Sequence, residues 1–119
     1  MTTSAFEMRA FLLKRRAERE AAVAQRSARL EAALPGLTDR LVALGARRVW
    51  LFGSLAWGVP HERSDIDLAV EGLPKDQFWE AYGAVLDEAP SDFNLVEVEH
   101  IDAGFAARIR DHGRLLHDG

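Results

Sequence analysis

The feature that most restricts the fold is a long stretch, Ser4 to Leu34, that contains neither proline nor glycine. Ala, Arg, Glu and Leu dominate it, and all four are good helix formers. Ser4 followed three residues later by Glu7 has the form of a capping box, which begins a helix. The sequence therefore predicts one long helix that ends at Pro35-Gly36, because these two residue types stop helices.

One face of this predicted helix carries small and apolar side chains at spacings of three and four. They are Phe6, Ala10, Leu13, Ala17, Ala21, Ala24, Ala28 and Ala32. The helix would be about 46 Å long, which exceeds a typical globular helix. It either packs on its own domain or docks on a partner protein or on a second copy of the chain, and the length slightly favours docking. Formation of a homo-oligomer through this helix is therefore one of the alternatives that the sequence leaves undecided.

After Pro35-Gly36 the pattern changes to short elements, in which apolar strands alternate with helices. The predicted helices are 37–44, 74–86 and 103–110, and the predicted strands are 48–52, 66–70 and 93–99, with a short edge strand at 115–116. This order is typical of an α/β (α+β) domain, a small mixed sheet with flanking helices. We expect a helical extension over 1–36 and the domain over 37–119.

Composition excludes several classes of protein. Cysteine is absent, so disulfide scaffolds, thiol nucleophiles and Cys-ligated metal sites are excluded. Residues 1–35 carry seven Lys/Arg and four Asp/Glu (net +3), and residues 36–119 carry eight and fifteen (net −7), which sum to −4. An acidic body makes long nucleic acid an unlikely partner. No apolar run suits a membrane helix or a signal peptide, so we expect a cytoplasmic protein.

The pattern with chemical content begins where the predicted strand 48–52 runs into Gly53-Ser54. Glycine removes the side chain that would block a close phosphate, and serine offers a hydroxyl and a backbone N–H. Alone, Gly-Ser is usually an ordinary turn. After ten intervening residues, however, the sequence Asp65-x-Asp67 opens the next predicted strand.

Asp65 and Asp67 fall on the same face of a strand because side chains alternate. Two carboxylates about 7 Å apart repel each other unless a cation lies between them. Such oxygen ligands suit Mg²⁺, which keeps other positions for water and substrate phosphates. Two Mg²⁺ ions about 3.5–4 Å apart can hold the attacking and leaving oxygens of a displacement at phosphorus.

The arrangement Gly-Ser-x10-Asp-x-Asp, within GSLAWG and SDIDL, resembles the signature of minimal nucleotidyltransferases of the DNA polymerase β superfamily, over residues 37–119. The resemblance implies the nucleotidyltransferase fold and transfer of a nucleoside monophosphate, AMP if ATP is the substrate, to a hydroxyl with two Mg²⁺ ions. It further implies that Gly53 and Ser54 bind the β- and γ-phosphates and that Asp65 and Asp67 are metal ligands. Ser64 is a further candidate for nucleotide binding. Many such proteins are antitoxins that adenylylate a tyrosine of a HEPN-type toxin, which makes that toxin the expected partner.

One position departs from this signature. The family places a third Asp on the next strand, and here Asn94 stands at that catalytic position, in the segment Phe93-Asn94-Leu95-Val96. Asparagine coordinates through its carbonyl oxygen but cannot act as a base. Three explanations of Asn94 are open. The catalytic activity of the chain is weakened or lost, or Asp92 on the same strand face takes the place of the missing carboxylate, or Asn94 is an engineered inactivating change. We expect reduced activity relative to an Asp-bearing version.

Two other functions remain open at this point. A nucleotide-binding antitoxin without catalysis would neutralise its toxin by contact alone, and Asn94 is the feature that separates it from the enzyme. The chain is alternatively a nucleotidyltransferase for a small molecule, such as an antibiotic. The short length argues against this last alternative, because such enzymes usually carry an added helical domain.

Overall fold

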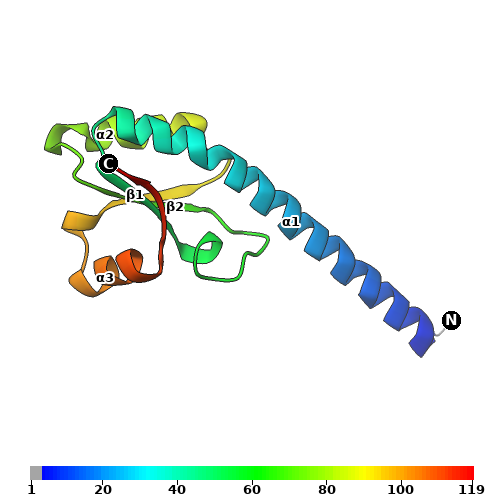
Figure 1. The fold of residues 1–119 in the computed structure, drawn as a ribbon. Coiled ribbons are helices and arrows are strands. Elements are labelled where there is room, and N and C mark those ends of the chain that lie inside the picture. The colour runs from blue at the N-terminus through cyan, green and yellow to red at the C-terminus, as the bar shows by residue number, and fades with distance from the viewer. Residues whose placement is uncertain (1–3) are drawn as a thin grey trace.

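The computed structural model describes residues 4–119 and contains a four-stranded mixed sheet with helices on both faces (Figure 1). The strands are β1 (Arg48–Phe52), β2 (Ile66–Glu71), β3 (Phe93–Glu97) and β4 (Arg114–Asp118), and their order in the sheet is β3-β2-β1-β4. β1 is antiparallel to both of its neighbours, and β2 and β3 are parallel. The expected mixed sheet is therefore confirmed, and residues 115–116 lie within edge strand β4.

In the described part of the chain, three α-helices and three short 3₁₀ turns accompany the sheet. The helices are α1 (Ala5–Ala43), α2 (Phe78–Glu88) and α3 (Ala103–His112), and the turns are η1 (Gly53–Leu55), η2 (Lys75–Gln77) and η3 (Val98–His100). The predicted helix 74–86 thus begins as a 3₁₀ turn. The predicted strand 93–99 is shorter than expected, because its last residues enter η3.

The prediction that the first helix ends at Pro35-Gly36 is wrong, because α1 runs through both residues. The predicted helix 37–44 is the last part of this same element. Leu30, Leu34, Leu37 and Leu41 recur at helical spacing and are all at most 3% exposed. Burying a leucine contributes about 1.5–3 kcal/mol, so four of them exceed the cost of about 3 kcal/mol for one proline inside a helix.

The first half of α1 extends away from the sheet, as Figure 1 shows in blue. Its N-cap is the one expected, since the Ser4 Oγ accepts a hydrogen bond from the Glu7 amide at 3.1 Å. The apolar residues near this end are solvent-exposed, Phe6 at 82% and Leu13 at 55%. The predicted small-residue face therefore does not pack on the chain's own domain in this half. Within residues 4–119, no helix is long and apolar enough to cross a membrane.

Alternation along the strands divides the buried side chains between the two faces of the sheet. Val49 and Leu51 of β1 belong to the larger core, which also contains the buried leucines of α1 and residues of α2. Trp50 and Phe52 belong to a smaller core with Ile109 of α3. The face toward α3 is the one that carries the candidate site, because the residue paired with Phe52 is an aspartate of that site.

Candidate active site

The sheet register brings the acidic residues of the signature together with Asn94. Asp67, near the start of β2, lies opposite Phe52 of β1 and opposite Asn94 of β3. Asp65 precedes β2 by one residue and has the same strand parity as Asp67. The Asn94 Nδ2 donates a hydrogen bond to the Asp67 Oδ1 at 2.7 Å. Asn94 therefore stands beside the carboxylate pair, where the signature has a third carboxylate.

Gly53 allows the Asp67 carboxylate to lie directly against the turn that follows β1. A Cβ at residue 53 would be 2.0 Å from the Asp67 Oδ2, which is not physically possible without a shift. Its φ of +76° is also in the left-handed region that favours glycine. Any side chain at this position would therefore push the Asp67 carboxylate away from the backbone of residue 53.

Ser54 is held by a second serine. Its Oγ donates to the Ser64 Oγ at 2.9 Å, and the same Ser64 oxygen accepts the His61 amide at 2.8 Å. Ser64 is only 1% exposed. In this arrangement Ser64 lies behind Ser54 and fixes its hydroxyl, so a contribution of Ser64 to nucleotide binding would act through Ser54.

The structure adds a residue that the sequence reasoning missed, Arg26 of α1. Its Nη2 donates to the Asp65 Oδ1 at 3.1 Å, and its Nε donates to the Ser64 carbonyl at 2.7 Å. Arg26 is 38 residues from Ser64 in the sequence and is one of many charged residues of a long helix. Nothing local distinguishes it, and only the packing of α1 against the sheet brings it to the site.

The electrostatics of the pair favour a bound cation. Burial raises the pKa of Asp67 above its ordinary value of 3.8, the hydrogen bond from Asn94 partly offsets this, and the negative charge of Asp65 raises the pKa further. A cation beside Asp67 would relieve both the desolvation and the repulsion.

The donors present fit Mg²⁺, which often takes one or two carboxylates and completes its shell with water and substrate phosphates. In residues 4–119 no group of three His, Cys, Asp or Glu side chains is placed to hold a metal ion. Asp92 therefore forms no three-carboxylate group with Asp65 and Asp67 in the described residues, and nothing in this structure supports it as the substitute for the missing carboxylate. The two-ion arrangement stays a prediction.

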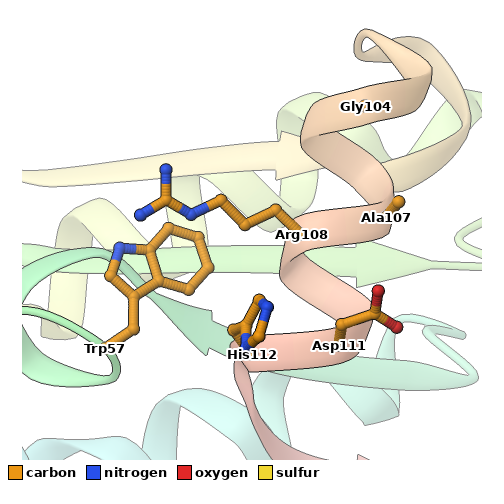
Figure 2. A pocket seen from close by; sticks show the side chains of 6 residues that line it. All are labelled: Trp57, Gly104, Ala107, Arg108, Asp111 and His112. Atoms are coloured by element: carbon orange, nitrogen blue, oxygen red, sulfur yellow. The ribbon is translucent and has the colours of Figure 1, made fainter.

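A hollow of about 600 Å³ adjoins the Gly53-Ser54 turn, between Trp57 and one side of α3 (Figure 2). The Trp57 amide donates to the Gly53 carbonyl at 3.0 Å, so this residue belongs to the same turn. Figure 2 shows the Arg108 side chain extended over the indole, and its guanidinium carbon is 4.6 Å from the ring centroid. Trp57 also packs on Phe52, with 5.9 Å between centroids. Trp57 thus serves as a packing residue in this structure, and the Arg108 guanidinium lies over its ring.

Comparison with known proteins gives one family and a set of related structures. Residues 45–119 match the family described as polymerase beta, nucleotidyltransferase. A chain from a toxin–antitoxin complex with AMP-PNP is 26% identical, with a TM-score of 0.55, covering 75% of this chain and 73% of that chain. A chain from a variant of the MntA toxin–antitoxin complex is 23% identical, with a TM-score of 0.56 and coverages of 72% and 73%.

A third similar structure contains the tri-AMPylated Shewanella oneidensis HEPN toxin in complex with its MNT antitoxin. It is 22% identical, with a TM-score of 0.54, and the match covers 76% of this chain and 73% of that chain. The comparison with curated proteins finds no match. The family match spans β1 to β4 and includes the Gly-Ser turn, both aspartates and Asn94. The chain therefore belongs to the polymerase beta nucleotidyltransferase family.

Proposed function

We propose that this chain transfers AMP from ATP to a hydroxyl of a HEPN-type toxin, with Mg²⁺ held by Asp65 and Asp67. The observation that carries the proposal is the close approach of the Asp67 carboxylate to the Gly53-Ser54 turn, which only glycine permits. Two structural neighbours support ATP as the nucleotide and a toxin as the acceptor of AMP. One of these complexes contains AMP-PNP, and the other contains an AMPylated toxin.

Each residue of the site has a chemical task in this reaction. Gly53 lets the phosphates approach the backbone, and the Ser54 hydroxyl, oriented by Ser64, donates to a phosphate oxygen. Asp65 and Asp67 hold Mg²⁺, which neutralises charge on the phosphates when bound. The acceptor hydroxyl attacks the α-phosphorus, the bond to pyrophosphate breaks, and the hydroxyl proton passes to water, since Asn94 cannot accept it.

A second candidate function is supported by the geometry of Asn94. Its Nδ2 donates to the Asp67 Oδ1. This hydrogen bond occupies one of the two carboxylate oxygens with which Asp67 would bind a metal ion. An antitoxin that binds nucleotide and neutralises its toxin by contact alone is consistent with this arrangement. The two functions differ in whether AMP is transferred.

The experiment is incubation of the chain with radiolabelled ATP, Mg²⁺ and the HEPN-type protein, followed by detection of label on that protein. Under the enzyme proposal, Mg²⁺-dependent label appears, and Asn94→Asp increases its rate at least about tenfold because a general base contributes that much or more. The double variant Asp65→Asn, Asp67→Asn should give no label.

Absence of transfer by both the natural chain and Asn94→Asp, with toxin still neutralised, would favour contact alone. An unchanged rate in Asn94→Asp would show that this strand position has no part in the chemistry. Asp92→Asn is the matched control, because its carboxylate is exposed and does not join Asp65 and Asp67.

A further inference from the structure

Arg26 connects the long helix α1 to the acidic pair. Its guanidinium makes two hydrogen bonds in different directions, to the Asp65 Oδ1 at 3.1 Å and to the Ser64 carbonyl at 2.7 Å. The Arg26 side chain is 24% exposed and that of Asp65 is 36% exposed. The bond to the Ser64 carbonyl holds the Arg26 guanidinium in place. Its single bond to Asp65 therefore orients that carboxylate more firmly than a surface ion pair between two mobile side chains does.

The segment between η1 and β2 depends on such anchors because it has no regular secondary structure over most of its length. Ser64, in this segment, is linked through its Oγ to Ser54 and through its carbonyl to Arg26. A second arginine of α1, Arg19, lies 3.5 Å from the Glu62 carboxylate in the same segment. Arg19 and Arg26 are seven residues apart and so share one helical face.

We propose that Arg26 is a positioning residue of the nucleotidyl-transfer site, which sets the orientation of Asp65 for Mg²⁺ binding. It engages the Oδ1 and leaves the Oδ2 for the cation, and it fixes Ser64, which in turn fixes the Ser54 hydroxyl. This inference rests on the proposed function, because it assigns Arg26 a role in binding of the Mg²⁺–nucleotide complex.

Arginine is required for this task because of its planar fork of donors. Lysine has a single ammonium group and cannot reach a carboxylate and a backbone carbonyl with fixed geometry. Arg26→Lys therefore keeps the charge and loses one directed bond, whereas Arg26→Met keeps much of the side-chain length and loses both. Ordering of a metal ligand by a neighbour commonly changes metal affinity by about 10–100-fold.

The test is calorimetric titration of AMP-PNP into the full chain at increasing Mg²⁺ concentration. We expect Arg26→Met to weaken Mg²⁺-dependent AMP-PNP binding at least about tenfold and Arg26→Lys to lie between it and the natural chain. Without Mg²⁺ the natural chain and the variants should be alike in showing no saturable AMP-PNP binding, because the effect acts through a metal ligand. Arg19→Met is the matched control and should match the natural chain.

Thermal unfolding of each variant separates loss of binding from loss of the fold, and Arg26→Lys supplies the result if Arg26→Met does not fold. Equal Mg²⁺-dependent binding by the natural chain and the Arg26 variants would overturn the inference while leaving the proposed function intact. An equal loss in Arg19→Met would also overturn it, because general anchoring of the segment would then explain the effect. No binding by the natural chain itself would overturn the proposed function, and the inference with it.

Discussion

Asp67 has a more constrained environment than a surface carboxylate. It lies against Gly53, accepts a hydrogen bond from Asn94 and shares its strand face with Asp65. The burial raises its pKa, so the charged form is disfavoured in the folded chain without a cation. The proposed metal ligand is thus maintained at some cost to stability, as is common for functional sites.

This cost predicts that Asp67→Asn stabilises the metal-free fold near neutral pH. A carboxyl whose pKa is raised on folding binds its proton more tightly in the folded state, so stability falls as pH rises above the ordinary value of 3.8. Asparagine has no charge to desolvate. Thermal unfolding in a chelating buffer should show a higher midpoint for Asp67→Asn than for the natural chain, and the difference should disappear well below pH 3.8.

The control for this measurement is Asp92→Asn, which removes an exposed carboxylate just before β3. It should have no comparable effect on the unfolding midpoint. A lower midpoint for Asp67→Asn near neutral pH would contradict the description of Asp67 as a carboxylate that is costly to ionise.

Sequence spacing was sufficient to predict the residues that lie on one strand or one turn. Gly53 with Ser54 and Asp65 with Asp67 are local patterns, and the structure places the two pairs side by side. The position of Asn94 also follows from strand parity once the register is known. Arg26 was not predictable, because its contact with Asp65 depends on how a distant helix packs on the sheet.

At the scale of elements, α1 shows how packing overrides a local helix-stop signal. Pro35-Gly36 has the composition of a helix end, yet the buried leucines on both sides form a single apolar stripe. The boundaries of the other elements were predicted within a few residues, because each is bounded by glycine, proline or a change of pattern. Predicting that α1 continues through Pro35-Gly36 would have required knowing which residues pack against that stripe.

Pro35 inside α1 predicts a simple stabilising substitution. Pro35→Ala restores a backbone donor in an exposed position of a continuous helix and removes a ring that crowds the preceding turn. We expect an increase of about 1–3 kcal/mol in the free energy of unfolding, which is the proline penalty less the entropy that proline removes from the unfolded chain. Urea unfolding at 25 °C measures it.

Leu37→Ala is the comparison variant, for which we expect a decrease in the free energy of unfolding. Leu37 is fully buried, and its truncation should lower the free energy of unfolding by about 2–5 kcal/mol. A decrease in stability on Pro35→Ala would show that the proline ring makes favourable contacts in α1 that outweigh its cost.

At the scale of the whole molecule, the dominant feature is the exposed first half of α1. The chain measures 66 × 30 × 20 Å along its principal axes, and Figure 1 shows the first half of α1 extending along the longest dimension. Phe6, Phe11, Leu12 and Leu13 on this segment are each more than half exposed. Apolar side chains grouped on a projecting helix are typical of a surface that a partner covers.

We therefore expect removal of residues 1–14 to leave the fold and nucleotide binding unchanged while weakening partner binding. The truncated helix keeps Arg19, Arg26 and the buried leucines, so its contacts with the sheet and the site remain. Affinity for the HEPN-type protein, measured by calorimetry or interferometry, should fall by about tenfold or more, which corresponds to at least about 1.4 kcal/mol.

The Leu13→Arg variant of the full-length chain is a finer test of the same surface. It should weaken partner binding without changing the thermal midpoint, because Leu13 makes no buried contact with the domain. Full affinity of the truncated chain for its partner would contradict a docking role for this half of α1.

The most direct test of the account is calorimetric titration of ATP into the chain with and without millimolar Mg²⁺. We predict saturable binding that requires Mg²⁺ and disappears in the double variant Asp65→Asn, Asp67→Asn, whose thermal unfolding remains cooperative. Failure of the natural chain to bind ATP with Mg²⁺, or unchanged binding by the double variant, would contradict the claim that these two aspartates and the Gly53-Ser54 turn form a nucleotide site.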